Sequence, residues 1–380
     1  MSGLTGTLVL PGLVDPHVHL REPGSNHSET IASGTKAALF GGYVLIGDMP
    51  NTPGHPTWTK DRLLEKHALA RDGAHIPTTF HSGAQPESDN VGELHAMSRL
   101  SLWLKLYGAP TTGNANDYAA ADFRDIVAEW HRVAPDKPIG LHAGRDNLED
   151  FIAVVAGSLR HPLHIHHVST NHELRLIHTA KRRDLPVTCG VTPHHLLKTA
   201  HDVRSEGWFA RVQPPLVGEA EAEELMRCLS DGTIDIVETD HAPHSKESKL
   251  RAESDNVEGL HTADHVTCFG LPCIELAAPL LFYQARRGYI TMERLVDALS
   301  TRPARIMGLS VSANTFASWE MREFRVGEEN VHSQCSWTPY LGRLALGIPG
   351  EVLVQGKPLI KDGVLVDRAP NVVTNRGSEI

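Results

Sequence analysis

Four short stretches of this sequence gather histidines and an aspartate that could bind a metal ion. They are "DPHVHL" with His17 and His19, "GLHAG" with His142, "HIHHVS" with His166 and His167, and "TDHAPH" with Asp240, His241 and His244. Imidazole nitrogens and carboxylate oxygens are common ligands of Zn²⁺ and similar divalent ions. The chain has 24 histidines among 380 residues, more than core packing requires. Metal binding is therefore the leading interpretation.

The spacing of the first pair supports this interpretation. Residues two apart in a β-strand point to the same face, so His17 and His19 can both turn toward one ion. A single histidine at the end of a strand more often has a structural role. Several histidines at the ends of different strands favour metal binding. Lys105 in "LWLKLYG" cannot bind a cation as an ammonium group. It fits a site with two metals if CO₂ carboxylates it; the alternative is an ordinary lysine among apolar neighbours.

The elements that must position these residues alternate along the chain. Apolar runs that end in polar residues occupy 12–20, 43–51, 76–84, 101–109, 137–145, 163–170, 185–195 and 234–244. Segments with helical character lie between them, at 57–73, 120–134, 171–184 and 219–232. Eight strands alternating with helices predict an α/β fold, a (β/α)₈ barrel of the TIM type, with an open doubly wound sheet as the alternative. Active sites of such barrels lie where the strands end, so the polar residues there should converge.

Composition excludes several classes of function. A formal net charge of -10 and an isoelectric point near 6.2, without a run of Lys or Arg, argue against a nucleic-acid partner. The longest apolar stretches, such as "CIELAAPLLFY", are shorter than the ~20 residues that span a bilayer, and no signal pattern begins the chain. We expect a cytoplasmic protein without a membrane partner. Five cysteines without a C-x-x-C pair are expected to be reduced and mostly buried.

The chain divides into three expected parts. Residues 11–315 should form the metal-dependent barrel. The short apolar run before it and the predicted hairpin "GEVLVQGKPLIKDGVLVDRA" should form a small composite appendage from 1–10 and 316–370. Residues 371–380 are polar and are expected to be a disordered tail.

Several of these motifs together resemble one enzyme family. "PGLVDPHVHLREPG", "DMPNT", "WLKLYG", "HHVS", "PVTCGVTPHHL" and "TDHAPH" occur in the order and approximate spacing of dihydroorotases of the amidohydrolase superfamily. The resemblance covers almost the whole chain. "SQCSWTPYLG" and the segment after it are similar to the dihydroorotase domain of the multifunctional animal pyrimidine enzyme and to related bacterial forms. Arg21 and Asn51 together narrow the superfamily to this branch.

The resemblance implies a centre with two Zn²⁺ ions or similar divalent metals. It makes His17, His19 and Asp240 ligands of one ion, His142 and His167 ligands of the other, and a carboxylated Lys105 the bridge between them. The family's pattern selects His167 over its neighbour His166. We therefore expect His166 to point away from the site.

The resemblance also implies residues that bind the substrate. Arg21, Asn51 and His244 resemble the residues that hold its α-carboxylate, a task that suits the donor fork of arginine. A salt bridge at the rim is the alternative for Arg21. The loop "GAPTTGNAND" resembles a mobile lid in which Thr111 and Thr112 close over the substrate, although surface loops of this composition often have no function.

The implied reaction is the reversible cyclisation of N-carbamoyl-L-aspartate to L-dihydroorotate in de novo pyrimidine biosynthesis. Asp240 would be both a ligand and the catalytic base that moves a proton from the attacking water to the departing ring nitrogen; the alternative is a plain ligand. The expected partners are this small substrate, a second copy of the chain in a homodimer, and aspartate transcarbamoylase.

This chain departs from its relatives at several positions. Gly144 stands where many relatives have an acidic residue, and Gly190 stands where some of them do. Cys273 stands where a glycine is common. Gln213 replaces an Arg or Asn before Pro-Leu, which puts one contact to the substrate ring in doubt. The segment 245–269 is longer and more polar than expected, and its role is open.

Two rival functions follow from the same motifs. A hydantoinase or allantoinase would use the same metals on another cyclic amide, but those branches do not typically follow H-x-H with an arginine, so Arg21 argues against them. A catalytically silent homologue could instead serve as a scaffold for aspartate transcarbamoylase. Silent forms tend to lose ligands, and all six are present here.

Overall fold

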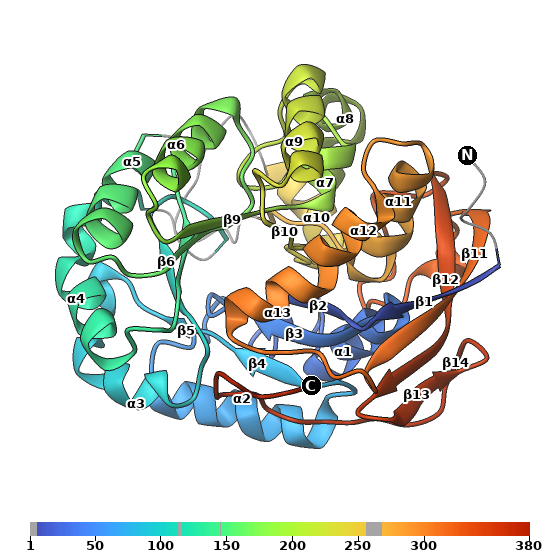
Figure 1. Ribbon diagram of the computed structural model, residues 1–380, viewed down its shortest axis with the longest axis horizontal. Coiled ribbons are helices and arrows are strands. Elements are labelled where there is room, and N and C mark those ends of the chain that lie inside the picture. The colour runs from blue at the N-terminus through green and yellow to red at the C-terminus, as the bar shows by residue number, and fades with distance from the viewer. Residues whose placement is uncertain (1–5, 113–115, 145, 256–267) are drawn as a thin grey trace.

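The computed structural model describes residues 6–112, 116–144, 146–255 and 268–380. Parallel strands surround its centre (Figure 1). They are β2 (Leu13–Val18), β3 (Tyr43–Asp48), β4 (Thr78–Phe80), β5 (Ser82–Gly83), β6 (Leu104–Tyr107), β7 (Ile139–His142), β8 (Leu163–Ile165), β9 (Val187–Val191) and β10 (Ile236–Val237). Every one lies within an apolar run that the sequence predicted as a strand, and the third run holds both β4 and β5.

These strands close into a barrel. One sheet has the order β2-β3-β4 and the other the order β10-β9-β8-β7-β6-β5. The third run joins them, because β4 pairs with β3 and β5 pairs with β6 on either side of His81. A parallel bridge between Val18 and His241 connects the remaining edges. The predicted (β/α)₈ barrel is confirmed.

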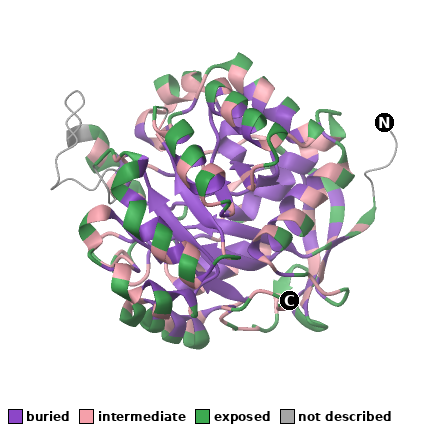
Figure 2. Cartoon of the chain, turned by 60° about the vertical axis from the view of Figure 1, so that its left-hand side comes forward, coloured by how far each residue is buried: buried purple, intermediate pink, exposed green. Residues whose placement is uncertain are grey.

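Helices cover the outside of the barrel. They are α1 (Ile31–Phe40), α2 (Lys60–Gly73), α3 (Leu94–Ser98), α4 (Arg124–Val133), α5 (Leu148–Phe151), α6 (Asn171–Arg182), α7 (Pro193–Leu197), α8 (Ala200–Glu206), α9 (Glu219–Asp231), α10 (Lys246–Asp255), α11 (Ile274–Arg286), α12 (Met292–Val296) and α13 (Arg302–Met307). The four predicted helical segments contain α2, α4, α6 and α9. Figure 2 shows that the strands in the interior are buried and that the outward faces of the helices are exposed. Among the described residues, no helix combines the length and apolar character that a membrane span needs.

Local sequence explains where these helices begin. Thr170 precedes α6, and its side chain accepts a hydrogen bond from the backbone N–H of Glu173 at 3.3 Å. The Glu173 carboxylate in turn accepts one from the backbone N–H of Thr170 at 2.8 Å. This capping box satisfies two donors that a helix start leaves without intrahelical partners. It fixes the start of α6 immediately after the histidines that follow β8.

A second, antiparallel sheet lies beside the barrel. Its order is β1 (Thr7–Pro11), β11 (Phe316–Arg325), β12 (Leu344–Val354), β13 (Lys357–Lys361) and β14 (Val364–Leu365), so its strands come from both ends of the chain. Trp319 of β11 packs edge-on against Phe282 of α11, with ring centroids 4.9 Å apart. The sheet therefore shares apolar contacts with the barrel. Residues 1–5, part of the expected appendage, lie outside the described residues.

The C-terminal tail differs from the sequence prediction. Residues 371–380 were expected to be disordered, but they pack along the barrel. Thr78 donates to the carbonyl of Asn371 at 2.8 Å, and Ile380 donates to that of Ser310 at 2.9 Å. Val373 and Ile380 are 5% and 2% exposed. The prediction was wrong because these two apolar side chains anchor an otherwise polar segment.

Candidate active site

The histidines predicted to be ligands converge at one end of the barrel. They lie at the C-terminal ends of β2 and β7 and just after β8, Asp240 follows β10, and Lys105 lies within β6. All six predicted ligands are buried: His17, His19, Lys105, His142, His167 and Asp240. The barrel thus brings together residues that are far apart in sequence, as the fold requires of its strand ends.

Two of the histidines meet at one carboxylate. Asp240 Oδ1 lies 3.0 Å from His19 Nε2 and 3.3 Å from His17 Nε2. These separations suit atoms that share a small divalent ion, which binds such ligands at about 2.0–2.2 Å. The three residues expected to hold the first metal therefore form a compact group.

The residues expected to hold the second metal adjoin this group. His142 Nδ1 and His167 Nε2 lie 2.9 Å apart. His17, His167 and Asp240 each offer a potential ligand atom, and these atoms lie within 4.8 Å of one another. The two predicted ligand sets are thus neighbours, which a bridged pair of ions requires.

Lys105 has the surroundings that a carboxylated lysine needs. Its Nζ is buried and has no hydrogen-bond partner among the described residues. Burial lowers the pKa of Lys105 to about 7, against the opposing charges of Glu238 and Asp240. A substantial fraction of the amine is therefore neutral at pH 7, and the neutral amine is the form that reacts with CO₂. The Nζ of Lys105 lies 5.2 Å from the centroid of the Tyr107 ring. A buried amine that lacks a hydrogen-bond partner among potential ligands fits a bridging carboxylate better than a permanent ammonium group.

Burial also keeps the histidines in the form that binds metal. It lowers the pKa of His17, His19 and His167 well below 6.5, and that of His142 to about 3. These imidazoles are neutral at physiological pH, with a lone pair free for coordination. Burial raises the pKa of Asp240 to about 7, although Lys105 opposes the shift. A carboxylate with such a pKa can both take and return a proton near neutrality.

The backbone is strained at three of the residues predicted to form the site. Arg21, His167 and Asp240 have φ angles of 61°, 39° and 46°, in the left-handed region that residues with a Cβ seldom adopt. Such strain costs about 1–3 kcal/mol per residue and persists where the surrounding structure enforces it. Its occurrence at three predicted site residues supports a functional role for this end of the barrel.

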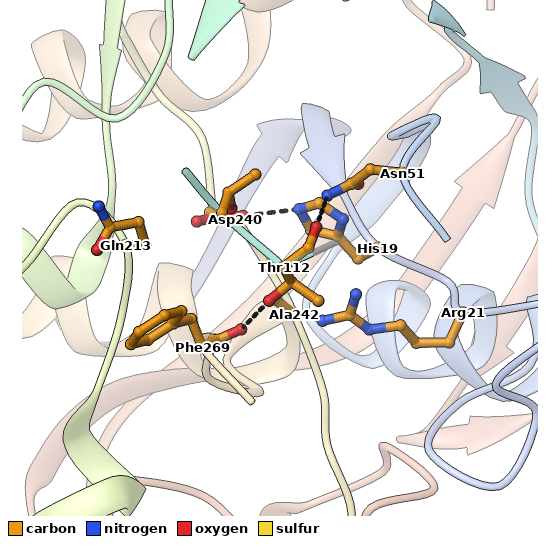
Figure 3. Close-up of a pocket in the computed structure, with 10 residues that line it drawn as sticks. His19, Arg21, Asn51, Thr112, Gln213, Asp240, Ala242 and Phe269 are labelled. Atoms are coloured by element: carbon orange, nitrogen blue, oxygen red, sulfur yellow. Dashed lines mark hydrogen bonds and ion pairs between the residues drawn. The ribbon is translucent and has the colours of Figure 1, made fainter. Parts of the chain in front are cut away.

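A small pocket opens beside Asp240 and His19. Figure 3 shows side chains from several loops around it. Five of the six residues predicted to bind substrate line this pocket: Arg21, Asn51, Thr111, Thr112 and Gln213. Gln213 lies across the pocket from Arg21 (Figure 3). The sixth, His244, contacts Arg21 directly.

Arg21 is the cation of this pocket. It is 2% exposed, and its Nε donates to the carbonyl of Pro243 at 3.1 Å. Its Nη2 lies 3.1 Å from His244 Nε2, which is also 2.9 Å from the carbonyl of Phe269. The tautomer of His244 decides which of these two contacts is a hydrogen bond. Within the described part of the chain Arg21 has no carboxylate within ion-pair distance, so it is not the rim salt bridge that the sequence left open.

The predicted lid lies against the pocket at its described residues. Asn51 Nδ2 donates to the carbonyl of Thr112 at 2.9 Å, and Thr112 Oγ1 donates to that of Phe269 at 3.3 Å. Among the described residues, Asn51 Oδ1 is buried and has no hydrogen-bond partner, which leaves an acceptor for a ligand. Residues 113–115 of the lid lie outside the described residues, as do 256–267 of the segment whose role is open.

The expectation that His166 points away from the site is wrong. Its Nδ1 lies 2.6 Å from Glu238 Oε2 and 3.1 Å from His17 Nδ1. Strand β8 ends at Ile165, and the positive φ of His167 breaks the alternation that would send neighbours to opposite faces. Both histidines therefore face the barrel interior, His167 toward His142 and His166 toward the layer beneath.

Sequence reasoning missed Glu238, a fully buried carboxylate beneath the site. It lies two residues before Asp240, just beyond the end of β10. A charged residue inside an apolar run was the available signal, because buried glutamates need a partner.

Comparison with known proteins places this geometry in a family. The model of the amidohydrolase family matches residues 8–316. A dihydroorotase from Anaeromyxobacter dehalogenans is 32% identical over 392 residues, covering 92% of this chain and 85% of that protein. Multifunctional protein CAD from Squalus acanthias is 34% identical over 361 residues, covering 93% of this chain but 15% of the relative's length.

A solved structure agrees on the fold. D-hydantoinase from a Bacillus sp. AR9 superposes with a TM-score of 0.84 at 21% identity, covering 99% of this chain and 90% of that one. At 21% identity this superposition shows only that the two proteins share a fold. The family model and the sequence relatives carry the assignment: the chain belongs to the amidohydrolase family and, within it, to the dihydroorotases.

Proposed function

We propose that this chain is a dihydroorotase that interconverts N-carbamoyl-L-aspartate and L-dihydroorotate. The observation that carries the proposal is the buried Arg21 on the wall of the pocket beside Asp240 and His19. A buried guanidinium without a carboxylate partner suits an anionic substrate, because it can donate two parallel hydrogen bonds to a carboxylate. Dihydroorotate carries that carboxylate, whereas hydantoin and allantoin do not.

The proposed cofactor is a pair of divalent metal ions, which we propose are zinc. His17, His19 and Asp240 would hold one, His142 and His167 the other, and a carboxylated Lys105 would join them. Two ions bound there supply polarisation of the amide carbonyl and a lower pKa for a bound water. The neutral imidazoles support this proposal, as does the buried amine of Lys105, which has no hydrogen-bond partner in the described part of the chain.

Asp240 would move the proton in both directions. When the ring opens, water adds to the amide carbonyl and gives its proton to the Asp240 carboxylate. The C–N bond then breaks as Asp240 passes that proton to the departing nitrogen; in cyclisation each transfer reverses. Its raised pKa supports this shuttle. Arg21, Asn51 and His244 would hold the substrate carboxylate, while Gln213 faces the ring and Thr111 and Thr112 exclude water.

The rival functions are less well supported. The hydantoinase structure shares the fold at 21% identity, which does not distinguish substrates, and Arg21 favours an anionic one. A silent scaffold would not need the six buried residues to converge. A homodimer and an association with aspartate transcarbamoylase remain predictions of the resemblance to multifunctional relatives.

Metal removal and return test the proposal. Purified protein should contain about two zinc ions per chain and hydrolyse dihydroorotate. A chelator should abolish both properties, and added zinc should restore them together. A chain that is purified without metal and gains no dihydroorotase activity with zinc would instead support the scaffold.

A further inference from the structure

Glu238 lies fully buried just beyond the end of β10, beneath the candidate metal ligands. Its Oε1 accepts a hydrogen bond from the backbone N–H of His167 at 2.6 Å. Three imidazoles surround its Oε2. His166 Nδ1 lies at 2.6 Å, His17 Nδ1 at 3.4 Å and His164 Nε2 at 3.5 Å. One carboxylate therefore contacts both predicted ligand sets, through the side chain of His17 and the backbone of His167.

The contact with His17 selects its tautomer. The Nε2 atom of His17 faces Asp240 at 3.3 Å, while its Nδ1 lies 3.4 Å from Glu238 Oε2 and 3.1 Å from His166 Nδ1. An ionised carboxylate only accepts hydrogen bonds, so Glu238 favours a proton on the Nδ1 of His17. A neutral imidazole carries one proton, so coordination through Nε2 requires that proton on Nδ1. A carboxylate beside Nδ1 stabilises this tautomer and also makes Nε2 a stronger donor to a metal.

The contact with His167 supports a strained backbone. His167 has a φ of 39°, and this conformation lets its side chain meet His142 at 2.9 Å. A hydrogen bond from its N–H to a buried carboxylate offsets part of the cost of that conformation. Without Glu238, the buried backbone N–H of His167 would lose this hydrogen-bond partner.

The neighbouring strand makes room for this carboxylate. Gly190 of β9 has no side chain, and a Cβ built there would lie 2.6 Å from both Cδ and Oε1 of Glu238. The carboxyl group thus occupies the space that a side chain at 190 would fill. A side chain at position 190 could place a carboxylate in the same volume. The negative charge could therefore be moved from residue 238 to residue 190 without being lost.

We propose that Glu238 is a positioning residue that fixes the tautomer of His17 and the backbone of His167, and thereby the geometry of the metal site. The inference rests on the proposed metal centre and extends it to a residue that would bind neither metal nor substrate. The cobalt-loaded protein gives a readout besides activity, because the visible absorption of Co²⁺ reports the geometry of its ligands.

The first test compares the wild type with Glu238→Gln. The amide keeps the volume and one acceptor but loses the charge that holds the Nδ1 proton of His17. We expect a changed Co²⁺ absorption spectrum and a metal affinity about 10- to 100-fold weaker. The kcat for dihydroorotate should fall while its KM changes little, because the pocket around Arg21 is untouched.

A matched control separates this role from a structural one. Glu275 is also buried, and its carboxylate accepts hydrogen bonds from the backbone N–H groups of His332 and Ser333, both at 3.1 Å. Glu275→Gln should lower thermal stability and leave the Co²⁺ spectrum and the metal affinity unchanged. Equal changes in the spectra of both variants would mean that any buried glutamate matters, and would overturn the inference.

Relocation of the carboxylate gives a rescue that does not depend on one variant folding well. Glu238→Ala should lose the wild-type spectrum, and Glu238→Ala combined with Gly190→Asp should regain it in part. Gly190→Asp alone should destabilise the protein, because its Cβ would collide with Glu238. A double variant that folds but is no better than Glu238→Ala in spectrum and affinity would count against a role for the charge.

The remaining outcomes are decisive as well. Wild-type spectrum and affinity in Glu238→Gln would overturn this inference and leave the proposed function standing. A wild-type protein that binds no Co²⁺ would overturn the proposed function, and this inference with it. His17, His166 and Glu238 also form a group of potential ligands. A third ion per chain that disappears in Glu238→Gln would make Glu238 a ligand and contradict the positioning role.

Discussion

His19 Nε2 and Asp240 Oδ1 lie 3.0 Å apart at the mouth of the barrel, although 221 residues separate them in the chain. The barrel creates this contact, because β2 and the segment after β10 are joined by the bridge between Val18 and His241. The first and last barrel strands therefore close the ring at the place where the proposed chemistry occurs. A carboxylate so placed can serve as a ligand and as a base.

Asp240→Asn tests the second of these roles. The amide keeps the shape and one potential ligand oxygen but cannot accept a proton, so kcat should fall about 100- to 10,000-fold. Much of the metal should remain, because four histidines and Lys105 are unchanged. Steady-state kinetics and metal analysis on the same preparation measure both quantities. A kcat near that of the wild type would refute the proton shuttle.

Arg21→Lys tests the recognition of the substrate carboxylate. Lysine keeps the charge but loses the fork of donors, so the KM for dihydroorotate should rise about 10- to 100-fold, the effect of one or two lost charge-assisted hydrogen bonds. Any activity on hydantoin, which has no carboxylate, should not change. Arg343→Lys is a control, since Arg343 donates to the carbonyl of Leu197 instead. Equal losses on both substrates would mean that Arg21 is structural.

Lys105→Ala should remove the bridge of the metal pair. We expect the metal content to fall below that of the wild type and activity to disappear. Bicarbonate added during reloading should raise metal uptake by the wild type and not by the variant. Lys198→Ala controls for loss of a buried lysine, because Lys198 pairs with Glu206 at 2.7 Å. Metal uptake by the wild type that ignores bicarbonate would argue against carboxylation.

Removal of residues 371–380 should destabilise the protein. The deletion exposes the cluster that Val373 and Ile380 share with Val14, Leu45 and Trp103. Each buried aliphatic side chain contributes about 1.5–3 kcal/mol, so the melting temperature should fall by several degrees. Differential scanning fluorimetry measures this change. An unchanged melting temperature would mean that the tail does not pack in solution.

His161 should make stability depend on pH. Burial lowers its pKa to about 4, while its Nε2 donates to the carbonyl of Lys137 at 2.9 Å. The unfolded chain, with a pKa near 6.5, binds more protons between these values, so stability is full above about pH 6.5 and falls as the pH drops toward 4. At most about 2 kcal/mol should be lost between pH 7 and pH 5.

Chemical unfolding of His161→Gln at the two pH values checks this prediction. The variant should lose less stability than the wild type on acidification, whereas His178→Gln, at an exposed position of α6, should behave like the wild type. The same loss in His161→Gln as in the wild type would show that other groups cause the acid sensitivity.

Much of this site could be predicted because it depends on regular structure. The period of a strand puts His17 and His19 on one face, and the barrel rule brings strand ends together, so the group of residues that converges could be inferred without coordinates. The division of the predicted ligands between two metals and the role of Lys105 came from the resemblance. The choice of His167 needed the resemblance to dihydroorotases.

The rest depended on local conformations that periodicity does not encode. His166 faces inward on the same side as His164, as the period of a strand requires, and the φ of 39° at His167 breaks the alternation so that His167 faces inward as well. Glu238 was missed because it finds its partners on β2 and after β8, through contacts that no local pattern reveals. The tail was misjudged because Val373 and Ile380, two apolar side chains in a polar segment, suffice to anchor it.

The most direct measurement of the central claim is a spectrophotometric assay of the purified, zinc-loaded protein with dihydroorotate, hydantoin and allantoin in parallel. A carboxylate-binding pocket built around Arg21 predicts hydrolysis of dihydroorotate and little or none of the two uncharged rings. Hydrolysis of hydantoin or allantoin without activity on dihydroorotate would contradict the account.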